Sequence, residues 1–436
     1  MRWIAAGALV LAGAAAWLFT PAELPSPSVS EFEIPPAASK AACPGPQRLP
    51  IGDAGTSGDL AAESDDIQLA ELGAGASFPV GLGRGWDAPL AASFERIGSG
   101  DLSGLAAVTC LTAGFDEWLV GGATTLGSSA RLVLSNPSDA PAEARITLYG
   151  PLGQIDDTVV IAVAPRGQEE RLIEGFAAEL STLAVHVETT GPGLVAVLQD
   201  SRLAGFQPAG TDWVSATTPL TRQVIPSVGS DAENATATLR LLAPEGAKAS
   251  VTLVTGAGVE AWSGARVIEL EPGVVTDISV PVNRLGALEI TSDTPILAAA
   301  RTVVPRAPKE GLEGDIAYEH RWVSGVSDAE QSTFAAIVPA DGTTVAAYSP
   351  VGGKIVFVDE AGNELASAVL APRTATRIPL PVAAGTFVTA TGRFAWALEV
   401  ENDEGFLTAL MPADTTRVDS TVTMIPAPYA PVVTAE

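Results

Sequence analysis

The sequence predicts an all-β protein, built as three tandem immunoglobulin-like β-sandwich domains that follow an N-terminal transmembrane or signal helix. Three observations lead to this expectation. Apolar and polar residues alternate along many short segments, which is the pattern of half-buried strands. The 43 glycines and 33 prolines supply frequent turns. The same order of strands and turns also returns three times along the chain.

The repeat sets the expected domain boundaries. Corresponding strands of the three blocks begin at residues 130, 237 and 343, so the repeat is about 107 residues long. In each block a glycine turn joins the second and third strands, and a proline, which has no N–H to give to a ladder, closes the third. With a leading strand, each block has about seven strands, as an immunoglobulin-like sandwich requires. We expect an irregular segment and the first sandwich in 43–222, the second in 223–333 and the third in 334–430.

An apolar run from Trp3 to Phe19 follows Arg2. As a helix it would be roughly 26 Å long, close to the roughly 30 Å hydrocarbon core of a bilayer. Arg2 precedes the run, so the positive-inside rule places the N-terminus in the cytoplasm and the body outside. We therefore expect residues 1–20 to be a signal-anchor helix that makes the protein single-pass in the cell membrane. The alternative is a cleaved signal peptide and a secreted protein, because residues 14–16 are small, as cleavage requires.

Residues 21–42 and the two cysteines indicate how the chain continues into the β-rich body. Five prolines in 21–42 oppose helix and sheet, so this segment is expected to be a semi-extended stalk. Cys43 and Cys110 would both lie outside the membrane, where disulfides persist. A bridge between them would pin segment 44–109 to the first sandwich. The alternative is a reactive or metal-binding thiol pair, but no histidine lies close to either cysteine in sequence.

The charge of the chain excludes one class of partner. Lys and Arg number 24 against 51 Asp and Glu, which gives a net charge of −27. Such a body repels the phosphate backbone, so no nucleic-acid partner is expected. The acidity also keeps an apolar secreted protein soluble, and this interpretation needs no bound cation.

A tryptophan stands in the segment before each block or between blocks, at Trp118, Trp213 and Trp322. One interpretation is an aromatic platform on which a sugar ring stacks. The other is that each indole packs over a seam between domains, which is the more common role of so large a side chain.

We find no catalytic, cofactor-binding or metal-binding pattern in the sequence. The two histidines, His186 and His320, are far apart, and no nucleophile-elbow or S-x-x-K motif occurs. The many carboxylates leave one enzymatic alternative open, an acid pair that acts on envelope glycan. Otherwise we expect a non-catalytic scaffold or binding module of the cell envelope, whose partner is another protein or a cell-wall polysaccharide. Exposed tryptophans would favour the polysaccharide, whereas buried tryptophans and an exposed apolar sheet edge would favour a protein.

The chain also resembles an uncharacterised family of membrane-anchored envelope proteins of high-GC Gram-positive bacteria. The resemblance covers most of residues 40–430 and rests on the motifs Cys43-Pro44-Gly45-Pro46, Cys110 with Trp118-Leu119-Val120-Gly121-Gly122, Leu134-Ser135-Asn136-Pro137, and Gly210-Thr211-Asp212-Trp213. It implies an extracytoplasmic location and β domains. The family's activity is unknown, so the resemblance assigns no site residues.

Overall fold

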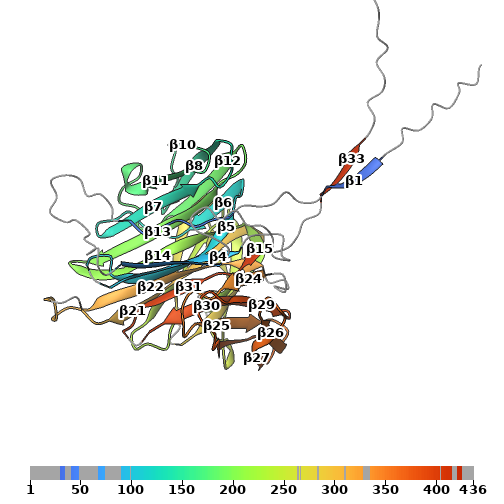
Figure 1. Ribbon diagram of the computed structural model, residues 1–436. Helices are drawn as coiled ribbons and strands as arrows, with labels where there is room; N and C mark the ends of the chain where they lie inside the picture. The colour runs from blue at the N-terminus through green and yellow to red at the C-terminus, as the bar shows by residue number, and fades with distance from the viewer. Residues whose placement is uncertain are drawn as a thin grey trace, which may run out of the picture. The chain divides into compact units, whose positions relative to one another are not determined.

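The computed structural model describes residues 30–34, 41–48, 67–73, 90–98, 100–262, 265, 267–281, 284–308, 311–327, 334–402, 404–414 and 420–424. The chain divides into two units. One comprises residues 1–37 and 418–436, and in it β1 (Ser30–Ile34) pairs antiparallel with β33 (Ser420–Met424). The other, residues 38–417, is a compact body of strands (Figure 1).

The expected all-β class is confirmed. Strands and turns make up the described residues, together with a short 3-10 turn, η2 (Ile173–Gly175), and these residues contain no α-helix. No helix in this described part is long and apolar enough to cross a membrane. The predicted anchor helix, residues 1–20, lies outside the described residues, as does most of the predicted stalk.

Segment 44–109, which showed only brief strand signals in the sequence, contributes to an antiparallel sheet in the order β2-β5-β4-β3. The four strands of this sheet are β2 (Ala41–Ala42), β3 (Ile67–Gly73), β4 (Ala91–Ile97) and β5 (Gly104–Thr112).

Three blocks of strands follow, close to the predicted positions. Block 1 consists of β6 (Asp116–Val120), β7 (Ser128–Ser135), β8 (Ala142–Gly150), β9 (Gly153–Gln154), β10 (Val159–Val163), β11 (Gln168–Leu172), β12 (Ala184–Thr190) and β13 (Val195–Ala204). Block 2 consists of β15 (Leu220–Val228), β16 (Thr236–Leu242), β17 (Ala247–Thr255), β18 (Gly258–Glu260), β19 (Ile268–Leu270), β20 (Val275–Val280) and β21 (Gly286–Arg306). Block 3 consists of β24 (Phe334–Ile337), β25 (Thr344–Ser349), β26 (Gly353–Val358), β27 (Glu364–Leu370), β28 (Thr374–Pro379), β29 (Phe387–Thr391) and β30 (Ala395–Glu401).

All three blocks have the same strand pairing. Leaving aside the short β9 and β18, the first strand pairs with the sixth, the sixth with the third and the third with the fourth. The second strand pairs with the fifth and the seventh. In block 2 the sixth and seventh strands are the two halves of β21, which passes from one sheet to the other. The strands of each block thus form two paired sets. A buried apolar cluster is centred on each block, and the cluster of block 1 also includes Leu242, Val275 and Leu297 of block 2.

This pairing differs in two respects from the immunoglobulin arrangement. In the constant-type domain the first strand lies beside the second and the seventh beside the sixth. Here the first strand lies beside the sixth and the seventh beside the second. The two terminal strands have therefore exchanged sheets, and the fourth strand, which lies beside the fifth in the immunoglobulin domain, lies here beside the third.

Four strands lie at the centre of the body, and we call them the central strands. They are β5, β14 (Gln207–Thr217), β22 (Ala317–Ser324) and β31 (Leu407–Leu410). Each is the second arm of an antiparallel hairpin, whose first arms are β4, β13, β21 and β30. Contacts run from β5 to β14, on to β22, on to β31 and back to β5, which closes a ring between the blocks.

The chain leaves the ring in the same way in each block. The end of β14 pairs with β6, β23 (Val326–Ser327) pairs with β15, and β32 (Ala413–Asp414) pairs with β24. Each central strand of a block therefore leads back to the first strand of that block. The strands β14 and β22 thus occupy the segments between the repeated blocks that hold Trp213 and Trp322.

Candidate functional site

Charged side chains from all three blocks meet around the central strands, and we call this set the buried polar cluster. Its members are Asp200, Arg202, Asp212, Arg301, Arg306, Glu319, His320, Arg321 and Glu399. Several of them, among them Asp212 and Arg321, have no exposed surface. Because burial of a charge is costly unless it is paired, each of these groups needs a partner within the protein.

Asp200 and Asp212 tie two hairpins together through Trp322. The indole Nε1 of Trp322 donates to Asp200 at 2.8 Å, and the backbone N–H of Trp322 donates to Asp212 at 2.7 Å. Arg202 also donates to Asp200, at 3.1 Å. Thr408 on β31 donates to Asp212 at 3.0 Å, so this carboxyl joins three of the central strands.

The imidazole of His320 lies directly against the backbone of β14. Its Nδ1 donates to the carbonyl oxygen of Ala209 at 2.9 Å, since a carbonyl can only accept. A Cβ at Gly210 would lie 2.4 Å from that nitrogen, and Gly210 has a φ of +96°, so only glycine fits here. The other ring nitrogen, Nε2, lies 3.4 Å from Asp200 and makes no hydrogen bond.

The surroundings of these groups move their pKa values in different directions. Burial raises the pKa of both Asp212 and Glu319 well above their usual range. Burial alone would also raise the pKa of Asp200, but the positive charges of Arg202 and Arg301 and the interaction with the adjacent His320 outweigh it, and the net pKa is lowered. Burial lowers the pKa of His320, which favours the neutral imidazole.

Blocks 2 and 3 meet through Arg321 and Glu399. Arg321 Nη2 lies 2.7 Å from Glu399 and also donates to Ser227 and to the carbonyl oxygen of Gly229. Arg377 donates to the second oxygen of Glu399 at 2.9 Å. Burial would raise the pKa of Glu399, but Arg321 and Arg377 lower it overall, so the carboxylate is ionised and paired.

Packed strands enclose the buried polar cluster, and this limits the functions that its carboxylates can have. A substrate needs access to the reacting groups, whereas these carboxylates lie between packed strands. Buried ion pairs contribute little net stability, but breaking one is costly, so they can enforce a single arrangement of the parts that they join. We interpret the cluster as the device that holds the three blocks in register.

The three tryptophans of the sequence analysis are all buried, with 6%, 2% and 3% of Trp118, Trp213 and Trp322 exposed. Trp118 is on β6, where its ring stacks on His186 with 3.8 Å between ring centroids. Trp213 packs in an apolar cluster between β5, β7 and β13. An open stacking platform for sugar is therefore corrected to packing, because no indole offers a free face. Trp118 is also not equivalent to the other two, which lie on central strands.

The expected bridge between Cys43 and Cys110 is present. It anchors the segment that follows, and we call residues 44–48 the strap. Gln168 donates to the carbonyl oxygen of Pro44 at 2.5 Å, and the backbone N–H of Gln47 donates to the carboxyl of Glu95 at 2.7 Å. The bridge thus fixes the strap across block 1 and β4.

Replacing both cysteines with alanine is expected to lower the free energy of unfolding by about 2–4 kcal/mol, because the closed loop restricts the unfolded chain. The loop is long, with a sequence separation of 67. Denaturant midpoints of the two proteins measure the loss. Reduction of the wild type should give the same midpoint as the variant, and an unchanged midpoint in both would contradict a stabilising role.

Two hollows differ in the chemistry of their walls. The first, which we call the junction cavity, has a volume of about 450 Å³ and lies where the four central strands end. Its walls include Leu90, Leu220, Val326, Phe334 and Met411, and its ionisable members are Asp116 and Glu117. Burial raises the pKa of Glu117 to about 8.

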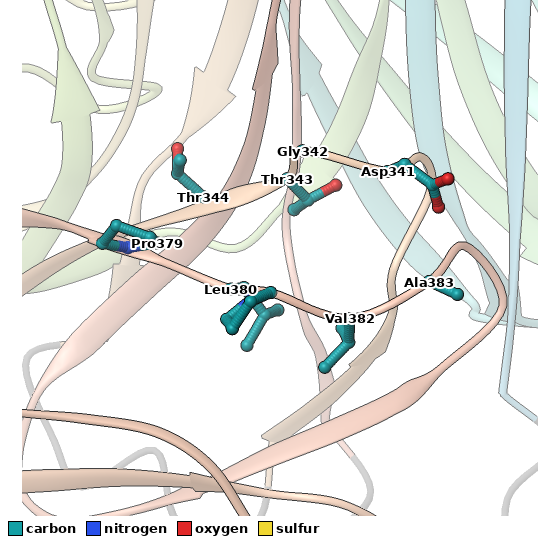
Figure 2. A pocket seen from close by; sticks show the side chains of 9 residues that line it. Asp341, Gly342, Thr343, Thr344, Pro379, Leu380, Val382 and Ala383 are labelled. Atoms are coloured by element: carbon teal, nitrogen blue, oxygen red, sulfur yellow. The ribbon is translucent and has the colours of Figure 1, made fainter.

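The second hollow, of about 390 Å³, lies at one end of block 3. Figure 2 shows Thr343 and Thr344 on one segment and Pro379, Leu380 and Val382 on the segment facing it. Of its lining residues only Asp341 is ionisable, and its carboxylate accepts a hydrogen bond from the backbone of Ala384. This hollow therefore lacks a set of converging polar groups, and we assign it no chemistry.

Residues 72–380 match a protein family whose description is Family of unknown function (DUF5719). The chain belongs to this family. The matched range begins in β3 and ends just after β28, so it contains the first two blocks and three of the central strands. No curated protein and no solved structure matches the chain.

Sequence reasoning identified some members of the buried polar cluster but not the cluster itself. Asp212 directly precedes Trp213 in the sequence, and His320 and Arg321 directly precede Trp322. Several of the contacts that join the blocks connect residues far apart in sequence, as from Asp212 to Thr408 and from Arg321 to Glu399. One signal was available: β14 and β22 hold charged residues beside Trp and Val, which is unusual for a loop.

Proposed function

We propose that this DUF5719 protein is a non-catalytic, extracytoplasmic protein of the cell envelope that acts as a binding scaffold for another protein. In this proposal residues 1–20 anchor it in the membrane as a single pass, or direct its secretion if they are cleaved. The three blocks then form tandem immunoglobulin-like sandwiches with exchanged terminal strands. The resemblance to membrane-anchored envelope proteins of high-GC Gram-positive bacteria supports this location.

The observation that carries the proposal is the contrast between the buried tryptophans and the apolar outer edges. The fourth strand of each block, β10, β19 or β27, pairs with one neighbour among the described residues. Val160, Val267 and Val369 lie on or beside these strands, with exposed fractions of 54%, 70% and 80%. An unpaired edge with β-branched side chains is a template for an added strand, so these edges suit an extended segment of a partner protein.

The two alternatives have less support. The polysaccharide alternative requires exposed indoles, whereas Trp118, Trp213 and Trp322 are buried. A glycan-acting enzyme needs two carboxylates in a groove that the polysaccharide can enter. The carboxylates of the buried polar cluster are enclosed, so a polysaccharide could not reach them.

Site-specific cross-linking tests the proposal in intact cells. The full-length chain would carry a photoreactive residue at Val160, Val267 or Val369, with Glu360 at an exposed hairpin tip as the matched control position. We expect protein adducts from the edge positions and few from Glu360. Co-sedimentation with cell-wall material, before and after its proteins are removed, separates the alternatives. Binding to protein-free glycan without protein adducts would contradict the proposal and favour a polysaccharide partner.

A further inference from the structure

An acidic hollow of about 270 Å³ adjoins the junction cavity. Its ionisable residues are Asp116, Glu143, Arg145 and Glu188, on the strands β6, β8 and β12. Asp116 lines both hollows, so they meet at this residue. Its side chain is 70% exposed, which places the meeting point at the surface.

The charges in the acidic hollow are not balanced by the fold. Asp116 and Glu188 stand directly opposite each other on paired strands, an arrangement that is destabilising for like charges. Arg145 is opposite Glu188 on its other side, and His186 donates to Asp116 at 2.7 Å. Three carboxylates surround one guanidinium in this hollow, so an additional cation would be attracted.

The adjoining surfaces are apolar. Phe115 is 60% exposed beside Asp116, and an exposed aromatic face attracts a cation as well as an apolar group. Two of the hydroxyls in the wall of the junction cavity donate to other wall residues. Thr217 donates to the carbonyl oxygen of Gly325, and Ser324 donates to that of Ser215. The cavity therefore offers an incoming group mostly apolar contact.

We propose that the junction cavity and the acidic hollow together form the docking site for a segment of a partner protein that carries a large apolar side chain next to a basic one. The apolar side chain fills the cavity, as anchor residues do at protein interfaces. The basic side chain lies between Asp116 and Glu188 and removes their repulsion. The net charge of −27 favours such a partner at long range as well. This inference rests on the proposed function, because it names the class of segment that the scaffold binds.

Methyl NMR of the full-length protein tests the site directly. The chain has three methionines, of which Met411 lines the junction cavity and Met424 lies in the other unit. The probe is the peptide acetyl-Gly-Phe-Arg-Gly-amide, titrated into protein labelled with ¹³C at the methionine methyls. Its matched controls replace Phe with Ala or Arg with Gln. We expect the Met411 signal to move and the Met424 signal to stay, with each control peptide binding about tenfold more weakly or worse.

Protein variants separate the two halves of the site. Glu188→Gln should weaken the Phe-Arg peptide to the level of the Phe-Gln peptide, while Glu269→Gln, at an exposed site in block 2, should leave it unchanged. Thr112→Trp, at an exposed position of the cavity lining, should block all the peptides. A Met411 signal that ignores the Phe-Arg peptide, or responds equally to all three, would overturn the inference. If protein cross-links at the edge valines persist in that case, the proposed scaffold function stands and only this docking site fails.

Discussion

Replacing Arg321 with methionine is expected to lower the free energy of unfolding by about 3–5 kcal/mol, which is typical when one partner of a buried ion pair is removed. The substitution takes away a guanidinium that is fully buried between blocks 2 and 3. Glu399, Ser227 and the carbonyl of Gly229 would each lose a donor in a site that water does not reach. Urea or guanidinium unfolding midpoints measure the change.

Two further variants show whether the loss comes from the buried pair. The double variant Arg321→Met, Glu399→Met should lose less than the sum of the two single losses, because it removes both charges together. Arg166 pairs with Asp139 at the surface, and Arg166→Met should leave the midpoint unchanged. Equal midpoints for Arg321→Met and Arg166→Met would show that the buried polar cluster does not hold the blocks together.

Most strands could be predicted from the sequence because their burial follows the alternation of apolar residues. The corresponding strands expected to begin at residues 130, 237 and 343, for example, are β7, β16 and β25, which begin at Ser128, Thr236 and Thr344. The central strands β14 and β22 do not follow this pattern, since charged residues occupy buried positions along them. Alternation indicates burial only where buried residues are apolar, so it fails at a polar centre.

Local sequence patterns also cannot predict that a long strand is continuous or that the terminal strands exchange sheets. The repeat predicts separate sixth and seventh strands in each block, but in block 2 one continuous strand, β21, supplies both. Pro295 lies between its two sets of ladder partners, where the strand changes sheets and no ladder hydrogen bond is needed from it. Which strand lies beside which depends on contacts between distant residues, and a repeat in sequence cannot choose between two pairings of the same strands.

The same limit explains why the docking site was missed. Asp116 and Glu188 are far apart in sequence, and each looked like an ordinary exposed acid. Their opposition appears only once β6 and β12 pair. The junction cavity likewise needs wall residues from every block and from the N-terminal sheet, including Leu90, Leu220 and Met411. A binding site made at a junction of repeats has no signature within any one repeat.

Replacing Glu95 with glutamine is expected to change how stability depends on pH. Burial raises the pKa of Glu95 from 4.5 to about 7, although a hydrogen bond from the backbone of Gln47 lowers it in part. Between these two pH values the folded chain keeps a proton that the unfolded chain has lost. The contribution of Glu95 is therefore fully present below pH 4.5 and is lost as pH rises to about 7.

The difference in unfolding free energy between wild type and Glu95→Gln isolates this one group. It should fall by on the order of 3 kcal/mol across that range, since each pKa unit corresponds to about 1.4 kcal/mol. Glu117, Asp212 and Glu319 also have raised pKa values and give slopes of the same sign, but they are present in both proteins and cancel. Glu269→Gln, at an exposed site, should give a curve parallel to the wild type. A flat difference for Glu95→Gln would mean that this carboxyl ionises normally, and that the strap leaves it open to water.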